Sequence, residues 1–251
     1  MAAAILTAEW RWLAMLNYRV PRALLTPLVP RGTRLDLWNG AAYISVVGFL
    51  FRKTRIFGVR VPFHGVFEEV NLRFYVCREV DGEVRRGVTF IREIVPKRAV
   101  TVVARLAYNE PYRTLPMHHQ LGMIGPSGRP FSVEYTWRLR GEWSGMRLFP
   151  EGESYFSPPG SEEEFITNHR WGYTRRRTGG TTEYEVRHKP WRVCRATQGE
   201  VAGDVSRVYG RDFAEVLAGA PHSAYFASGS VVSLFRPVRL HLKRRSAISA
   251  V

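Results

Sequence analysis

Cysteine is scarce in this sequence, which contains only Cys77 and Cys194. Two cysteines are too few for a disulfide framework or for a zinc site built from thiolates. Cys77 extends a strand-like pattern and Cys194 sits in WRVCRA. We therefore expect two packed thiols and no cysteine nucleophile.

Long apolar runs are also absent. No stretch approaches the roughly 20 apolar residues that a membrane-spanning helix needs. The first ten residues, MAAAILTAEW, have no basic region ahead of their short apolar run, unlike a secretion signal. We therefore expect a cytoplasmic protein without a membrane partner.

Acidic residues are few relative to basic ones. Asp and Glu number 22 against 37 Lys and Arg, which gives a formal net charge of +15. Such an excess attracts anionic partners, or it only helps solubility. The densest basic runs are Arg175-Arg176-Arg177 and Lys243-Arg244-Arg245, and no helix-turn-helix, zinc-finger or RNA-binding aromatic motif accompanies them. The sequence disfavours nucleic acid as a partner and leaves open a basic surface that binds other anionic molecules.

The short motifs of several large enzyme classes are missing as well. The sequence has no G-x-S-x-G elbow, no phosphate-binding glycine loop and no dinucleotide fingerprint. His118 and His119 are adjacent, so they point to opposite faces of a strand, and the other histidines lack metal-ligand spacing. No metal is expected, and no organic cofactor is implied.

What the sequence does contain is a series of short β-like segments. The chain has 251 residues, of which 45% are hydrophobic and 13% aromatic, and it can bury one large core. Asn39-Gly40 and Asp81-Gly82 favour tight hairpins because both residues of each pair tolerate positive φ. The spacing predicts a strand over 100–108.

Three helices are expected among these strands. They are predicted over 21–28, after a capping box that starts at Ser161, and over 205–217. We therefore predict a single domain over 1–251, mainly antiparallel β with two or three short helices, and a basic tail from about 236. Many short strands at this spacing favour a barrel or a sandwich.

One strand-like stretch, FEEVNLRFYV, has an apolar row and a polar row. The polar row carries Glu69, Asn71 and Arg73. Glu93 and Arg105 occur on the following predicted strands, where some of these groups can meet if the strands are neighbours. The polar row either faces solvent, as is common in antiparallel sheets, or lines an internal cavity.

The stretch GVTFIREIVPKRAV resembles a segment of the acetoacetate decarboxylase superfamily, in which a strand with Arg-Glu leads to Pro-Lys-Lys. Upstream, ALLTPLVPRGTRLDLWNGAAYISVVGF resembles that superfamily's helix, Val-Pro and strand. A subgroup without an assigned activity, the YqjF-like family, is more similar still in MLNYRVPRALLTPLVP, FEEVNLRFYV, EEFITNHRWGY and VRHKPW. These segments extend over most of residues 10–235. The resemblance implies a cone-shaped, mainly antiparallel β-barrel that encloses a pocket.

The resemblance also implies roles for individual residues. Lys97 is similar to the superfamily's Schiff-base lysine, while its second lysine is replaced here by Arg98. Arg11 resembles a pocket arginine on an N-terminal strand, and Glu69 resembles a pocket glutamate. A second pocket glutamate has no match, because Ser45 or its neighbours occupy that region.

The implied chemistry requires a neutral lysine. Desolvation and a nearby cation lower an ammonium pKa, so that the amine can attack a ketone carbonyl. Arg98 supplies a like charge, although adjacent residues in an extended segment point apart. The alternative is that Lys97 is a solvated turn lysine, which is the ordinary place for lysine.

Three functions follow as hypotheses. The first is Schiff-base decarboxylase-type chemistry on a small oxo or carboxylate compound; the second is a small-molecule-binding barrel that does not use the lysine; the third is a basic protein that binds anionic partners. A homo-oligomer stays open. The residues expected in the site are Lys97 and Glu69 as catalytic groups, Arg11, Asn71 and Arg73 as substrate-binding groups, and Arg98, Arg105 and His118 as secondary candidates.

Overall fold

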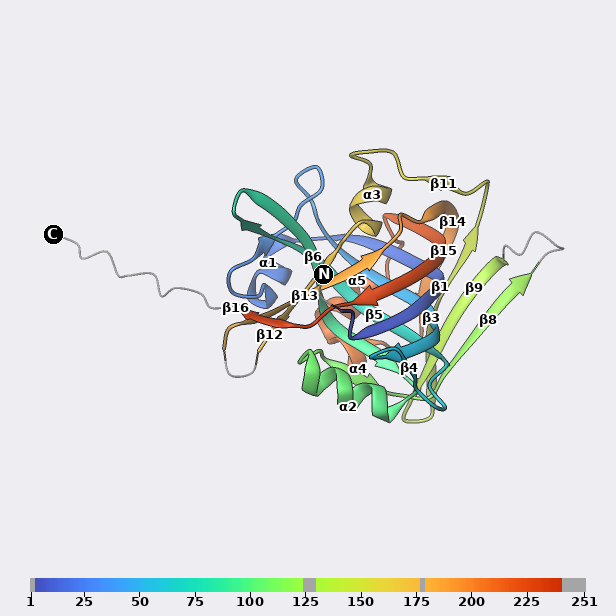
Figure 1. Ribbon diagram of the computed structural model, residues 1–251. Coiled ribbons are helices and arrows are strands. Elements are labelled where there is room, and N and C mark those ends of the chain that lie inside the picture. Colours follow the sequence, from blue (N-terminus) through green and yellow to red (C-terminus); the bar gives the residue numbers. More distant parts are fainter. Residues whose placement is uncertain (1–2, 124–129, 177–178, 241–251) are drawn as a thin grey trace.

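The computed structural model describes residues 3–123, 130–176 and 179–240 (Figure 1). Most of this chain is β-strand. The strands are β1 (Leu6–Val20), β2 (Arg34–Leu35), β3 (Ala42–Ile56), β4 (Val59–Arg60), β5 (Val66–Val80), β6 (Glu83–Val95), β7 (Tyr112–Thr114), β8 (Met117–Met123), β9 (Pro130–Leu139), β10 (Glu142–Pro150), β11 (Tyr155–Phe156), β12 (Trp171–Arg175), β13 (Thr181–His188), β14 (Arg192–Ala202), β15 (Ser223–Leu234) and β16 (Val238–Leu240).

The long strands close into a ring. Hydrogen-bonded neighbours follow the order β13, β12, β6, β5, β3, β1 and β15, and β15 pairs back with β13. Every pair in this ring is antiparallel except β12 with β6. Each strand of the ring thus has a hydrogen-bonded neighbour on both sides, with only two register pairs between β12 and β6. The prediction of a mainly antiparallel β-barrel is therefore confirmed.

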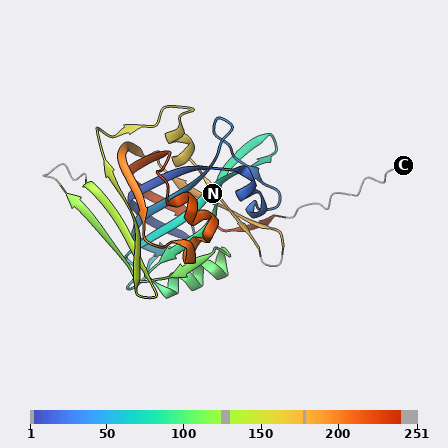
Figure 2. The same cartoon turned by 180° about the vertical axis from the view of Figure 1, so that it is seen from behind.

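Both faces of the central strands β1, β3 and β5 are buried, which creates two cores. The inner core lies within the ring and includes Val47, Phe49 and Tyr75. The outer core packs the opposite faces of these strands against β8, β9 and β10 and against the helices near the C-terminal end (Figure 2). The two layers meet closely at Gly48, where a Cβ atom would lie 2.5 Å from Cδ2 of the buried Tyr135.

The helices are short and lie between strands. They are α1 (Arg22–Leu25), α2 (Arg98–Ala107), α3 (Glu162–Thr167), α4 (Ser206–Tyr209) and α5 (Arg211–Leu217), with a 3₁₀ turn at Thr26–Leu28. Five α-helices in the described residues correct the expected two or three. None of them is long and apolar enough to cross a membrane.

The largest difference from the sequence-based expectation is α2, which replaces the strand predicted over 100–108. Valine at positions 100, 102 and 103 favours a strand because it is β-branched. Helical spacing nevertheless places Val100 and Ala104 on one side of the segment, against the barrel, and Val102 and Leu106 on the other. Packing of one helical face against the barrel overrides the local preference.

Local turn and cap signals are confirmed at several points. Asn39-Gly40 and Asp81-Gly82 both adopt positive φ, as tight hairpins require. The Ser161 side chain accepts a hydrogen bond from the Glu164 backbone N–H at 3.2 Å, so the predicted cap of α3 forms.

The expected basic tail from about 236 is partly structured. Val238–Leu240 forms β16, which pairs with β13. Lys243-Arg244-Arg245 and Arg177 lie outside the described residues.

Candidate functional site

The polar row of β5 points into the barrel. Glu69 and Asn71 are each only 2% exposed. Glu69 accepts hydrogen bonds from Asn71 Nδ2 at 3.1 Å and from the Tyr112 hydroxyl at 2.8 Å. The strand register sets Asn71 opposite Glu93 of β6, and Glu93 opposite Tyr112 of β7. Three neighbouring strands thus bring two carboxyls, an amide and a phenol together.

A third buried carboxyl, Glu110, enters from the connection between α2 and β7. Its Oε1 accepts hydrogen bonds from Thr174 Oγ1 at 2.5 Å and from the Tyr184 hydroxyl at 2.8 Å. Thr174 belongs to β12 and Tyr184 to β13. These contacts connect the α2–β7 segment to the strands that close the barrel.

Burial raises the pKa of all three carboxyls. The pKa is raised to about 7 for Glu69 and to about 8 for Glu110, with desolvation as the main cause. Desolvation and then the charges of Glu110 and Glu69 raise the pKa of Glu93 well above its usual value. The hydrogen bond from Tyr112 opposes this shift at Glu69. Near neutral pH the cluster therefore holds protons, and its carboxylic acids can donate hydrogen bonds.

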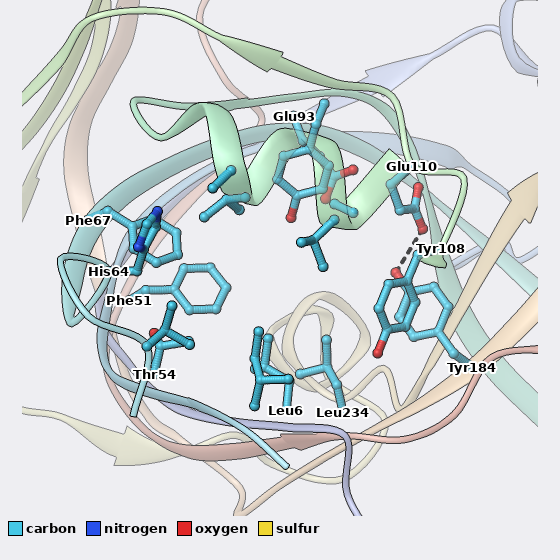
Figure 3. Close-up of a pocket in the computed structure, with 17 residues that line it drawn as sticks. Leu6, Phe51, Thr54, His64, Phe67, Glu93, Tyr108, Glu110, Tyr184 and Leu234 are labelled. Atoms are coloured by element: carbon cyan, nitrogen blue, oxygen red, sulfur yellow. Dashed lines mark hydrogen bonds between the residues drawn. The ribbon is translucent and has the colours of Figure 1, made fainter. Parts of the chain in front are cut away.

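A cavity of about 130 Å³ lies beside this cluster, between α2, the β3–β4 hairpin and the ends of β1 and β15. It is lined by Leu6, Phe51, Thr54, Ile56, Val61, His64, Phe67, Glu93, Ala99, Val100, Val103, Ala104, Tyr108, Glu110, Tyr112, Tyr184 and Leu234. Figure 3 shows that Glu93, Glu110 and the tyrosines Tyr108 and Tyr184 gather on one side of the cavity, and the other walls are mostly apolar.

Several polar atoms around this cavity have no protein partner. Within the described residues, Glu93 Oε2, Glu110 Oε2 and the Tyr108 hydroxyl are buried on one side of the cavity and make no hydrogen bond, and Thr54 Oγ1 is in the same state on another wall (Figure 3). An unsatisfied buried polar group costs about 1–3 kcal/mol, so three of them in one place usually have a reason. All three residues line the cavity, and a bound molecule can satisfy them.

Lys97 lies at the N-terminal end of α2, where its carbonyl accepts the Thr101 N–H at 3.3 Å. It is half-buried, and its side chain is not among the described groups that line the cavity, although Ala99 and Val100 are. Arg98 is exposed. The structure thus places the lysine next to the cavity wall and not in it.

Arg105 and Arg73 hold backbone segments near the site. The Arg105 guanidinium donates to the Tyr112 carbonyl at 3.0 Å, which fixes β7 against α2. Arg73 donates to the Ile166 carbonyl of α3 at 3.1 Å. The Arg73 charge lowers the pKa of Glu69, but burial of Glu69 outweighs it.

The structure does not bring Arg11 and His118 to this cluster. A bulge between Arg11 and Ala14 sets Arg11 opposite Leu50, whose side chain belongs to the outer core. The Arg11 guanidinium pairs with Glu9 at 3.1 Å. His118 is exposed on β8, with its ring 5.1 Å from that of Trp143.

No group of three or more His, Cys, Asp and Glu side chains in the described part of the chain is arranged to hold a metal ion. Cys77 and Cys194 are both buried.

Glu110, Tyr112 and Tyr184 are site residues that the sequence did not single out. Glu110-Pro111-Tyr112 follows a segment predicted as a strand, and its sequence is typical of an ordinary loop. The alternation of Glu110 and Tyr112 around Pro111 was the available signal, but only the tertiary structure brings Tyr184 to it.

The chain matches known proteins at both the sequence and the structure level. The YqjF protein of Bacillus subtilis (strain 168), which is uncharacterised, is 29% identical over 109 residues, and this match spans 43% of each protein. The solved structure of MppR, an enduracididine biosynthesis enzyme complexed with pyruvate, has a TM-score of 0.68 at 15% identity and covers 96% of this chain and 92% of its own.

Two further solved structures have the same fold. Acetoacetate decarboxylase from Legionella pneumophila has a TM-score of 0.67 at 9% identity, with coverage of 96% and 88%. An acetoacetate decarboxylase-like enzyme from Sphingomonas wittichii RW1 has a TM-score of 0.65 at 13% identity, with coverage of 95% and 94%. The fold is therefore that of the acetoacetate decarboxylase-like proteins. Residues 7–231 match the DUF2071 family of uncharacterised conserved proteins, and the chain belongs to that family.

Proposed function

We propose that the cavity binds an uncharged, largely apolar carbonyl compound, and that Glu93 and Glu110 donate hydrogen bonds to its oxygen. The observation that carries this proposal is the pair of buried carboxyl oxygens, one on each glutamate, that face an apolar cavity and have no partner among the described residues. Two protonated carboxyls at one end of an apolar space suit a molecule with one polar end.

Charge argues for a neutral ligand. No Arg or Lys is among the described residues that line the cavity, whereas Glu93 and Glu110 are. A carboxylate ligand would lose its hydration shell in the cavity without gaining an Arg or Lys partner, and its charge would repel any ionised glutamate. The charge of the cavity therefore favours a neutral oxo compound over a carboxylate as the ligand.

The carbonyl class has support from the fold relatives. The solved structures with this fold include acetoacetate decarboxylases and an enzyme complexed with pyruvate. A carboxylic acid that donates to a carbonyl oxygen draws electron density from the carbonyl carbon, which is the start of general acid catalysis. Binding and acid catalysis thus need the same two glutamates.

A matched pair of ligands tests this proposal. We expect the methyl ester of a 3-oxo acid to bind more tightly than the free acid, by at least about tenfold, because only the acid carries a charge to desolvate. Isothermal titration at several pH values should show ester binding weaken above pH 8, as the pKa of Glu110 is about 8. Tighter binding of the free acid would contradict the proposal.

Variants with amide side chains supply the control. Glu93→Gln and Glu110→Gln keep a neutral hydrogen-bond donor that does not ionise. Each should therefore reduce the loss of ester binding at alkaline pH relative to the unchanged chain. If both variants lose binding in parallel with the unchanged chain as pH rises, these glutamates do not contact the ligand.

Schiff-base chemistry at Lys97 is the second candidate. It is favoured by the place of Lys97 in the chain, immediately before α2, from which Ala99, Val100, Val103 and Ala104 line the cavity. In this reaction the amine attacks the ketone carbon, the oxygen leaves as water, and an imine forms.

Borohydride trapping distinguishes the two candidates. Reductant added with a panel of 2- and 3-oxo acids and ketones would convert an imine at Lys97 to a stable secondary amine, seen by intact mass and peptide mapping. We expect no adduct at Lys97, because its side chain does not line the cavity. A stoichiometric adduct that disappears in Lys97→Ala would replace the proposal with Schiff-base catalysis.

A further inference from the structure

Large apolar side chains are exposed on the two segments that border the cavity, the β3–β4 region and α2. We define the mouth patch as Phe57, Val59 and Phe63 of the β3–β4 region together with Val102 and Leu106 of α2. Their exposed fractions are 72%, 69%, 92%, 55% and 83%. Exposed apolar groups that cluster in this way usually mark a contact surface on a soluble protein.

The two halves of this patch border the same cavity. Val61 and His64, which lie within two residues of Phe63 in the sequence, line the cavity from one side. Val103 and Ala104, which lie between Val102 and Leu106 in the sequence of α2, line it from the other side. Figure 1 shows the β4 segment and α2 both on the lower side of the molecule. A surface that covers the mouth patch would therefore also cover the two segments that border the cavity (Figure 1).

Backbone geometry gives a second, independent reason to attach a role to these residues. Phe57 and Phe63 have φ angles of 48° and 61°, in the left-handed region that suits Gly, Asn and Asp. Phe57 precedes Gly58 in a tight turn, and the residues at the same position of three other turns are polar: Asn39, Asp81 and Arg140. An exposed phenylalanine in this conformation costs stability without gaining burial, so selection for a contact outside the chain explains it better than folding does.

The charge around the mouth patch indicates the type of partner. Neither 51–66 nor 97–108 contains an Asp or Glu, and Arg55, Arg60 and Arg98 are exposed beside the apolar residues. A second copy of this chain packed face to face would bring these cations together, which is unfavourable. A surface that is apolar inside and anionic outside would pair with both features.

We infer that the mouth patch docks on an anionic lipid bilayer, with its apolar side chains inserted among the acyl chains and its arginines at the phosphate groups. Such interfacial binding needs both apolar insertion and electrostatic attraction. It differs from the expectation of no membrane partner, which considered only membrane-spanning segments. The cavity would open toward the bilayer and could exchange its ligand there, a step that rests on the proposed function, whereas the docking itself does not.

Vesicle flotation tests the docking. The full chain should float with phosphatidylcholine vesicles that contain phosphatidylglycerol, should not float with phosphatidylcholine alone, and should dissociate in high salt. Phe63→Asn combined with Leu106→Gln should lower binding at least about tenfold, because it removes apolar insertion. Arg60→Gln should lower it about fivefold and reduce the salt dependence. Asn suits the left-handed backbone at 63, and both residues are exposed, so these variants should fold.

A matched control uses an exposed aromatic residue at a distance from the mouth patch. Phe156 of β11 is 59% exposed, and Phe156→Asn should leave vesicle binding unchanged. An equal loss in this variant, or no flotation of the unchanged chain, would overturn the inference. So would a dimer in solution that Phe63→Asn with Leu106→Gln dissociates while vesicles are not bound. Binding of the neutral ester without vesicle binding would leave the proposed function intact.

Discussion

Unfolding experiments should find this protein several kcal/mol more stable at about pH 5 than at about pH 9. The expected direction follows from the three buried carboxyls. The pKa is raised to about 7 for Glu69, to about 8 for Glu110, and well above its usual value for Glu93. In the unfolded chain all three return to values near 4.5.

A raised carboxyl pKa makes stability fall as pH rises. Between pH 4.5 and about pH 8, the folded state keeps the proton on Glu110 and the unfolded chain has lost it. The folded state thus binds more protons, and the free energy of unfolding decreases through this window. Each such carboxyl contributes up to about 1.4 kcal/mol per pH unit, so a total loss of about 3 kcal/mol or more is expected.

Ion pairs set the acid limit of this stability. Lys53 and Arg11 lower the pKa of Glu9, so protonation of Glu9 at low pH removes a stabilising interaction. Below about pH 4.5 stability should therefore fall again, and the maximum should lie in the weakly acidic range. This differs from most proteins, whose paired carboxylates favour neutral pH.

Urea unfolding at a series of pH values measures the effect. Glu110→Gln should be more stable than the unchanged chain at about pH 9 and should flatten the profile, because the amide fills the same space and does not ionise. Its Oε1 can still accept from Thr174 and Tyr184. Glu142→Gln, at an exposed position of β10, should leave the profile unchanged. Stability that rises steadily from pH 5 to pH 9 would show that these carboxyls are ionised in the folded protein.

The sequence predicts most of the fold because its strongest signals are local. Hairpins at Asn39-Gly40 and Asp81-Gly82 depend on two residues whose φ preferences are known. The cap at Ser161 depends on a partner three residues away. The strand predicted over 100–108 is wrong because the β-branched residues of this segment favour a strand, whereas its packing against the barrel favours a helix. The hydrophobic periodicity of so short a segment does not distinguish a helix from a strand.

The site is less predictable because it is assembled from segments far apart in the chain. Alternation along β5 correctly grouped Glu69 with Asn71, but it did not reveal that both faces of β5 are buried. A one-residue bulge turns Arg11 toward the outer core, and a bulge has no clear signature in a single sequence. The contact between Glu110 and Tyr184 joins residues 74 positions apart, which no local pattern encodes.

We expect closure of the barrel to depend on one buried carboxylate more than on any surface ion pair. Glu183 of β13 is 5% exposed, and its two oxygens accept from Arg78 and Arg85 of the β5–β6 hairpin, each at 2.9 Å. Glu183→Ala should lower the free energy of unfolding by about 3–5 kcal/mol, because it leaves two half-buried guanidinium groups unpaired and close together. Chemical denaturation measures this loss.

A surface pair is the matched control for Glu183. Glu200 pairs with Arg147, and both side chains are about half exposed, so Glu200→Ala should cost less than about 1 kcal/mol. The two variants remove the same chemical group and differ in burial and in place. Equal losses of unfolding free energy would mean that the ion pairs of Glu183 contribute no more to stability than a surface ion pair does.

The position of Glu183 in the ring explains why the difference should be large. β6 and β12 share only the register pairs Trp171–Gly87 and Gly172–Val88, whereas β5 pairs with its neighbours along most of its length. This seam is also tight, since a Cβ on Gly87 would lie 2.5 Å from the Trp171 carbonyl oxygen. Glu183 connects β13 across the seam to the β5–β6 hairpin. Loss of Glu183 should therefore increase hydrogen exchange first in β12 and β13, because few backbone pairs hold these strands to β6. The same two strands carry Thr174 and Tyr184. The hydrogen bonds that these residues donate to Glu110 should therefore weaken as well.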